Sequence, residues 1–161
     1  MISQASMALL MRVLLASTPL ADKLDGLTSL FDSEAMDARG VIAQPISKRI
    51  TRGSRNALGV LLAIAMRSAN RVGLLLELEN RSAEPWAPRG VVVLEIGGED
   101  LVATVWPPEP IPPGGRGSVF IEAEAKDTQA LGTYVLKVSG DGPRGMTLGN
   151  ITFPRLEDRP E

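Results

Sequence analysis

Residues 71–80 read RVGLLLELEN, a stretch in which apolar and charged side chains alternate along the chain. The even positions from 72 to 78 are all apolar, whereas positions 71, 77 and 79 carry charges. Successive side chains of a β-strand point to opposite faces, so this period of two predicts a strand with one buried and one solvated face. Such a strand is typical of an antiparallel sheet that is covered on one side. The stretch therefore indicates a mostly β fold.

Similar patterns follow to the end of the chain, separated by proline and glycine turns. The predicted strands are residues 57–66, 71–80, 90–96, 101–106, 117–125, 133–139 and 146–153. Seven strands is the count of an immunoglobulin-like β-sandwich. Tyr134 follows a leucine-glycine corner, as a tyrosine corner does in such sandwiches; the alternative is a half-buried strand tyrosine whose hydroxyl meets water. The proline-rich stretch 107–115 is predicted to be a stiff connector rather than a ligand for SH3-type grooves.

Two helices are predicted ahead of the sandwich. Residues 3–16 are almost wholly apolar, which suits a helix that is buried on the sandwich or against a second copy of the chain. The run is too short to span a membrane, and Arg12 interrupts it without a preceding base, so no signal peptide is predicted. Thr18 can cap the second helix, and Pro19 suits its first position. The apolar positions at helical spacing are Met7, Leu10, Met11 and Leu14, then Leu20, Leu24, Leu27, Leu30 and Phe31.

These elements predict four regions along the chain. Residues 1–40 form a helical extension, 41–56 a basic connector, 57–154 the β-sandwich domain and 155–161 a polar tail. The strand at 57–66 is apolar on both faces, which indicates that the N-terminal helices pack on its outer side.

Composition excludes the commonest enzyme designs. The 161 residues contain no histidine and no cysteine, so Ser-His-Asp and Cys-His triads, HExxH zinc sites and imidazole bases are all impossible. Glu77 with Glu79, and Glu122 with Glu124, share strand faces and are interpreted as solvent-facing residues rather than calcium ligands. We therefore expect a non-enzymatic protein with no cofactor and no metal.

A basic segment lies in the middle of a chain whose net charge is -2. Residues 39–76 contain no acid and sum to about +7 at neutral pH. The densest part, 48–55, holds Lys48, Arg49, Arg52 and Arg55. One interpretation is a solvated linker; the alternative is a polyanion-binding segment for nucleic acid or anionic lipid. The absence of interleaved aromatic residues and the sequence pI of about 5.3 favour the linker.

Trp86 and Trp106 are the two tryptophans of the chain. Both lie at predicted strand boundaries, where large side chains close a sandwich, so packing is the favoured interpretation. The alternative is an aromatic platform for a sugar or peptide, with Trp86 as the candidate binding residue. Asn80-Arg81-Ser82 matches the N-glycosylation pattern, which we interpret as a chance match.

Several segments in a fixed order resemble a known family. They are ALGVLLAIAMRSANRVGLLLELENRSAEPWAPRGVVVL, VWPPEPIPPGGRGSVFIEAEA, ALGTYVLKV and MTLGNITFP, preceded by GLTSLFDSEAMDARGVIAQPISKRI. Together they resemble the C-terminal half of a paralogous family of uncharacterised myxobacterial proteins, a domain of unknown function. The resemblance covers residues 26–154 and implies an envelope or accessory interaction role, without catalytic or binding residues to carry over.

The sequence thus predicts a structural or protein-interaction module. Its partner is expected to be another protein or a second copy of the chain, with polyanion binding through residues 48–55 and carbohydrate binding as the alternatives. Without a predicted signal the chain is expected in the cytoplasm, whereas the resembled family is often exported or lipid-anchored.

Overall fold

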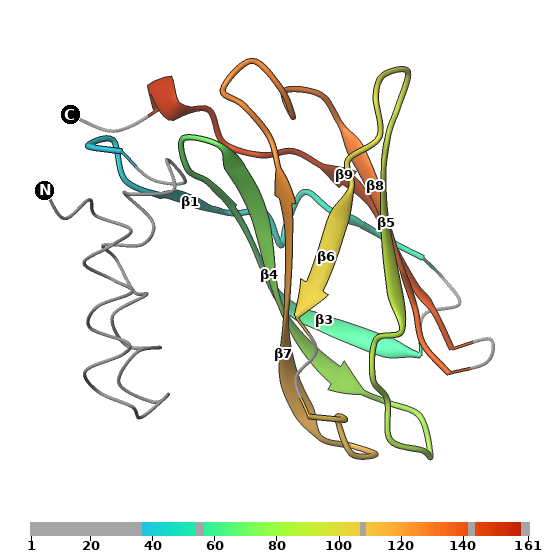
Figure 1. Ribbon diagram of the computed structural model, residues 1–161. Coiled ribbons are helices and arrows are strands. Elements are labelled where there is room, and N and C mark those ends of the chain that lie inside the picture. The colour runs from blue at the N-terminus through green and yellow to red at the C-terminus, as the bar shows by residue number, and fades with distance from the viewer. Residues whose placement is uncertain (1–36, 54–56, 107–108, 142–143, 159–161) are drawn as a thin grey trace, which may run out of the picture.

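The computed structural model describes residues 37–53, 57–106, 109–141 and 144–158. Within these ranges the chain forms nine β-strands and one short 3-10 helix (Figure 1). Both predicted N-terminal helices, including Met7–Leu15, lie outside the described residues. The elements are β1 Ile42–Pro45, β2 Thr51–Arg52, β3 Leu58–Arg67, β4 Arg71–Asn80, β5 Gly90–Glu95, β6 Ala103–Trp106, β7 Arg116–Glu124, β8 Tyr134–Ser139, β9 Met146–Ile151 and η1 Leu156–Asp158.

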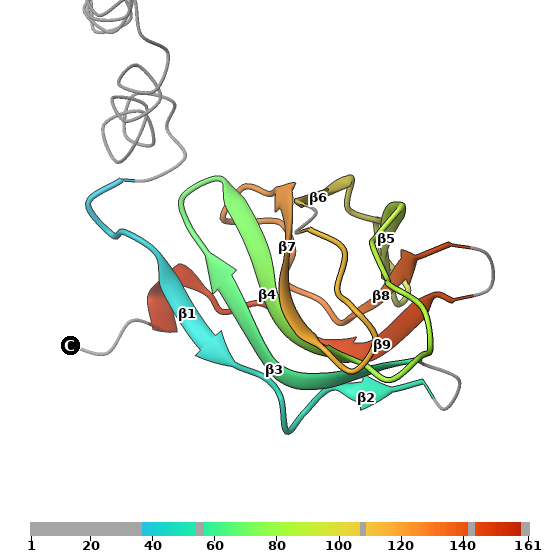
Figure 2. The ribbon, with the colours of Figure 1, turned by 90° about the horizontal axis from the view of Figure 1, so that it is seen from below.

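The strands form two antiparallel sheets that face each other. One has five strands in the order β1-β3-β4-β7-β6, and the other has four in the order β2-β9-β8-β5. The longest pairing is the β3–β4 hairpin, whose register runs from Leu58 opposite Asn80 to Arg67 opposite Val72. An irregularity between Val60 and Leu62 interrupts this register. Figure 2 shows the two sheets as curved layers with β1 and β6 at opposite edges of the larger one.

One hydrophobic core fills the space between the sheets. In β4 the apolar side chains at positions 72, 74, 76 and 78 are all at most 2% exposed, which confirms the alternation expected from the sequence. Their partners from the four-stranded sheet include Leu136 and Leu148, both fully buried. A single contiguous core of this kind removes the apolar face of each sheet from water and supplies the main stabilisation of the fold.

Backbone pairs outside the main ladders hold the two sheets together at their open edges. Val93 of β5 bridges Leu101, which precedes β6 in the other sheet. Trp86 and Ile111 form a second bridge, with N···O distances of 2.9 and 2.7 Å between their backbones. Ile111 lies in the proline-rich stretch and is buried, while Pro112 and Pro113 are exposed. The described part of this stretch thus packs its one large apolar side chain against the core.

The seven predicted strands correspond to β3 through β9, with bounds that differ by a few residues. The predicted total is not confirmed, because β1 and β2 bring the described residues to nine strands. Both lie in the predicted connector 41–56, which also adds Ile46 and Ile50 to the core. The predicted polar tail likewise differs, because Leu156 of η1 is buried. Connector and tail therefore belong to the packed fold at these positions.

Candidate interaction surfaces

The basic segment forms the connection between β1 and β2. Its turn is built on Ile46, whose carbonyl accepts hydrogen bonds from the backbone N–H groups of Arg49 at 2.9 Å and Ile50 at 3.2 Å. Burial of both isoleucines points the intervening side chains outward. Lys48 and Arg49 are exposed on this turn, and Arg52 is exposed on β2. The fourth predicted residue, Arg55, lies outside the described residues.

Three of the predicted cations therefore share one exposed connection. Arg52 donates from Nη2 to the carbonyl of Ser47 at 3.2 Å, and the Asn150 amide donates to the carbonyl of Arg49 at 2.7 Å. Across residues 37–53 and the other described ranges, no ion pair involves Lys48, Arg49 or Arg52. Their charges are thus open to solvent and to an anionic ligand.

Trp86 is fully buried and offers no open ring face. Its exposed fraction is 0%, and its indole N–H donates to the carbonyl of Arg144 at 2.8 Å. An aromatic platform for a sugar needs an accessible face, so this conformation gives the carbohydrate interpretation no surface at Trp86. Asn80 of the glycosylation pattern is also 0% exposed. Its amide donates to two backbone carbonyls, and its oxygen accepts from Ser82, as expected for a chance sequence match.

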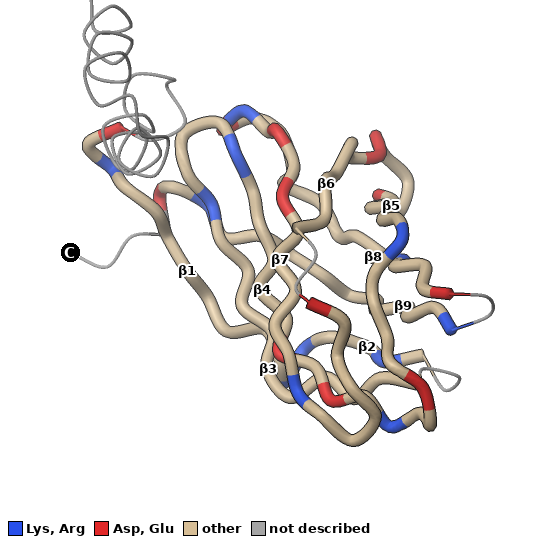
Figure 3. Tube along the Cα trace, turned by 60° about the horizontal axis from the view of Figure 1, so that its bottom comes forward, with Lys and Arg blue, Asp and Glu red and all other residues tan. Residues whose placement is uncertain are grey.

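An acidic cleft lies at the end of the fold where the β5–β6 turn meets the β7–β8 connection. Figure 3 colours acidic residues red along the chain, among them those of the β5–β6 turn. Its volume is about 650 Å³. Five carboxylates line it against a single guanidinium, that of Arg71, and leave an excess of four negative charges. The apolar lining includes Leu131, which is 44% exposed, and Val102, which is 92% exposed. The carboxylates are those of Glu95, Glu99, Asp100, Glu122 and Glu124.

Local backbone structure positions these carboxylates. β5 ends at Glu95, and the chain turns back through Gly97, whose φ of 78° favours glycine. Asp100 fixes this turn because its Oδ1 accepts the backbone N–H of Glu95 at 3.0 Å. On the opposite wall, Arg71 Nη1 lies 3.2 Å from Glu122 Oε1, so one of the five carboxylates already has a cationic partner. The others face the cleft without an ion pair among the described residues.

A buried arginine holds the β7–β8 wall of the cleft. Arg67 is 1% exposed, and all its partners are backbone carbonyls: Pro154 at 2.6 Å, Lys126 at 3.2 Å, Gln129 at 2.9 Å and Ala130 at 2.6 Å. Burial lowers the pKa of Arg67, partly offset by Tyr134 and Asp127. Ala130 has a φ of 54°, a left-handed conformation that an L-residue keeps only where its surroundings enforce it.

Tyr134 closes the floor of the cleft. It is 1% exposed at the start of β8, and its ring meets Phe153 edge-on with centroids 5.6 Å apart. Burial raises the pKa of Tyr134, and the charge of Glu95 and a hydrogen bond to that residue raise it further. Tyr134 lies at the start of β8, where a tyrosine corner would place it, and it is buried rather than half-buried. Its hydroxyl forms a hydrogen bond with the Glu95 carboxylate, whereas the hydroxyl of a tyrosine corner bonds to backbone a few residues upstream, so the tyrosine corner stays a prediction.

Within the described ranges, no cluster of three or more acidic side chains has the arrangement of a metal site. Sequence reasoning missed Glu95, Glu99 and Asp100, although the acids around the GG pair at 97–98 were visible as a charged turn between two strands. In the part of the chain that the structure describes, no helix is long and apolar enough to cross a membrane.

Fold and surface define the molecule as a two-sheet, mostly β protein with a charged cleft between loops at one end. Residues 21–151 match the model of a family described as protein of unknown function (DUF2381), and the chain belongs to this family. The match agrees with the domain of unknown function expected from the sequence. A search of curated proteins found no significant match.

Proposed function

We propose that this chain is a non-enzymatic, immunoglobulin-like β-sandwich that works as a protein-interaction module and binds a basic segment of a partner protein in the acidic cleft. The observation that carries the proposal is the cleft itself, with its excess of negative charge beside exposed apolar side chains. The absence of histidine and cysteine from the sequence supports the non-enzymatic part.

Strand order supports the immunoglobulin-like part. In immunoglobulin domains, strands A-B-E-D form one sheet and C-F-G the other. Here β3-β4-β7-β6 follow the first order and β5-β8-β9 follow the second, if β3 corresponds to strand A. β1 and β2 are then additions at the edges. The cleft lies between the loops equivalent to C–D and E–F, and loops at the ends of such sandwiches commonly carry binding residues.

The charge of the cleft selects the class of partner. An exposed ion pair contributes only about 0.2–1 kcal/mol, so selection of a cationic ligand depends on several carboxylates acting together. Lysine or arginine side chains entering between Glu95, Glu99 and Glu124 would meet carboxylates that have no ion pair among the described residues. Val102 and Leu131 at the rim favour apolar residues beside those cations. A basic peptide with flanking apolar residues combines both features.

Peptide binding tests this proposal directly. Labelled peptides of equal length and apolar content, but of positive, zero or negative net charge, are titrated with the full chain while fluorescence anisotropy is followed. Only the positive peptide should bind, and added salt should weaken it because exposed charges are screened. The double variant Glu99→Gln, Asp100→Asn should weaken binding of the positive peptide roughly tenfold. Two charges are lost in this variant, while the side-chain oxygen at position 100 can still accept its hydrogen bond.

The matched control carries the same chemical change on another surface. Glu77 and Glu79 lie on the outward side of β4, away from the cleft, and their double change to glutamine should leave binding unchanged. Equal affinity for peptides of all three charges, or equal losses in both double variants, would contradict recognition by the cleft.

Polyanion binding is the second candidate function. The observation that favours it is the exposure of Lys48, Arg49 and Arg52 without an ion pair among the described residues. Changing these residues and Arg55 to alanine should abolish salt-sensitive binding to duplex DNA or to vesicles of anionic lipid. The idea fails if the unchanged chain binds neither.

The sequence resemblance further supports a place in a myxobacterial paralogous family with an accessory role.

A further inference from the structure

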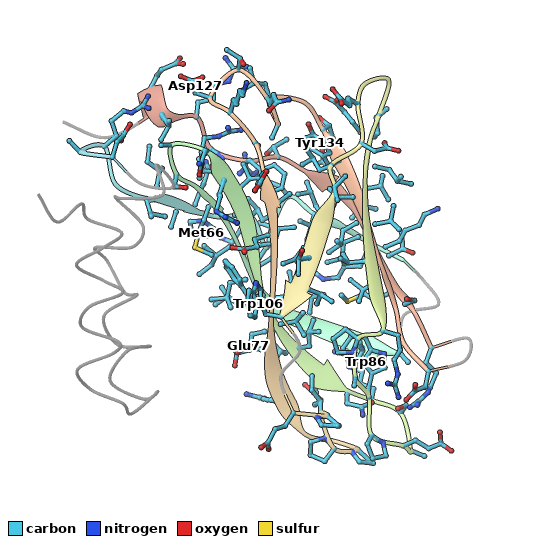
Figure 4. The ribbon with its side chains drawn as sticks, in the orientation of Figure 1. Met66, Glu77, Trp86, Trp106, Asp127 and Tyr134 are labelled. Carbon is cyan, nitrogen blue, oxygen red and sulfur yellow. The ribbon has the colours of Figure 1, made fainter. Side chains whose placement is uncertain are left out.

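An apolar row crosses the outward face of the five-stranded sheet, on the side opposite the core. The register places one residue from each strand side by side, and all five are apolar. Trp106 at the β6 edge is 58% exposed, and the three central side chains are partly exposed. Figure 4 shows Met66, which flanks this row, on the outward side of the sheet. From β1 to β6 the row is Pro45, Ile64, Leu75, Phe120 and Trp106.

Side-chain packing makes the row continuous. A Cβ at Gly73 would lie 2.9 Å from Cζ of Phe120, so the phenylalanine ring lies over bare backbone in the centre of the sheet. Glu77 and Glu122 flank the row on the same face, so the row itself is the apolar feature. Among the described residues, no such row crosses the outward face of the four-stranded sheet, where the exposed Val92 lies opposite Lys137 and Lys137 lies opposite Thr147. An outward sheet face normally carries polar residues, and a contiguous apolar one marks a contact surface.

We propose that the chain's own residues 1–36 cover this outward face. The apolar positions of this segment recur at helical spacing in two runs, 7–14 and 20–31. Five strands at a spacing of about 4.8 Å span about 19 Å. Two helices packed about 9 Å apart cover a similar width. The segment thus has the apolar content and size to bury the row.

Residues 1–36 are joined to the five-stranded sheet close to its edge, which favours covering by the same molecule over covering by a second copy. The described chain begins at Asp37 and turns at Gly40, whose N–H donates to the Asp37 carbonyl at 2.9 Å. It then enters β1, which is itself an edge of this sheet. The ten residues 32–41 can extend at most about 35 Å, which exceeds the width of the sheet. A segment tethered so closely has an effective concentration in the millimolar range, which favours it over a second copy.

Cysteine reactivity tests the proposal in the full chain, which has no cysteine of its own. Leu75→Cys places a thiol in the centre of the row, and Met66→Cys provides a second reporter if the first variant fails to fold. Both should react with a maleimide roughly tenfold faster after Leu10→Asp and Leu14→Asp are added, because the polar segment no longer covers the sheet. Lys137→Cys, on the outward face of the other sheet, is the matched control and should react at one rate in both backgrounds.

Each remaining outcome overturns the proposal. Equal rates with and without the aspartates would show that the segment does not cover the row. Protection that disappears on dilution, together with a dimer mass by light scattering, would assign the cover to a second copy. Protection that needs an added protein would assign it to a partner. Peptide binding in the acidic cleft uses other residues, so its success or failure is read separately from any of these results.

Discussion

Replacing Arg67 should be among the most damaging single changes in this protein. The guanidinium is fully buried at the end of β3 and has no carboxylate partner among the described residues. It instead joins three parts of the chain, because β3, the β7–β8 connection and the carbonyl of Pro154 meet around it. Replacing a buried ion pair by apolar residues is often harmless, but backbone carbonyls cannot be replaced together with the arginine.

The size of the effect follows from the acceptors left behind. The carbonyl of Lys126 also accepts the Gln129 N–H, whereas the carbonyls of Gln129, Ala130 and Pro154 have Arg67 as their one donor among the described residues. A buried group left unpaired costs about 1–3 kcal/mol. Three such groups, partly relieved by entering water, give a loss of about 3–5 kcal/mol for Arg67→Met. This is a large fraction of the about 5–15 kcal/mol that stabilises a domain.

Urea unfolding followed by circular dichroism measures this loss. Arg71→Met is the matched control, because it removes the same group from a partly exposed ion pair with Glu122. Such a pair contributes about 0.2–1 kcal/mol, so the control should unfold close to the unchanged chain. The free energy of unfolding of Arg67→Lys should lie between those of Arg67→Met and Arg71→Met. An ammonium group offers three hydrogen-bond donors but lacks the planar geometry of a guanidinium. An Arg67→Met variant as stable as the Arg71→Met variant would refute the reasoning, because desolvation of the guanidinium would then outweigh its hydrogen bonds.

Three further predictions concern buried polar groups. Tyr134 is the one tyrosine of the chain, so tyrosinate absorbance reports on it alone. Its pKa is raised in the folded state, so its hydroxyl loses the proton at a lower pH in the unfolded chain than in the folded one. Stability present below about pH 10 should therefore be lost as the pH rises, with tyrosinate absorbance appearing at higher pH in folded than in urea-unfolded protein. Trp86→Phe removes the hydrogen bond to Arg144 and leaves a small cavity, at a cost of about 2 kcal/mol; an unchanged urea midpoint would contradict this. Asn80→Asp replaces the amide that donates to two carbonyls by a carboxylate that those carbonyls repel when it is ionised. The melting temperature should therefore fall more at neutral than at acidic pH, and equal losses at both would contradict this.

Much of the strand content could be predicted because it depends on local pattern. The alternation in β4 reappears as four buried apolar side chains and three partly exposed charged ones, and β3 through β9 correspond to the seven predicted segments. β1 and β2 were missed because residues 42–52 lack alternation and carry exposed cations. Their pairing with β3 and β9 depends on partners distant in the sequence, which no local pattern reports.

The candidate surfaces were predicted less well. Exposure of Lys48, Arg49 and Arg52 follows the expectation for a charged turn. Arg67 belongs to the same basic stretch yet is buried, because four carbonyls from two distant segments converge on its guanidinium. The acidic cleft was missed because its carboxylates come from one turn and two strands, and β5 and β7 are far apart in sequence.

The sequence by itself determined the β character of the chain, the order of its main strands and the absence of histidine and cysteine chemistry. Period, turn residues and composition are local properties, so one sequence is enough to read them. Tertiary structure alone decided which loops meet. It brings the β5–β6 turn beside the β7–β8 connection, buries Trp86 and Arg67, and aligns one apolar residue from each of five strands. These are long-range juxtapositions, fixed by sheet order and register rather than by any neighbouring residue.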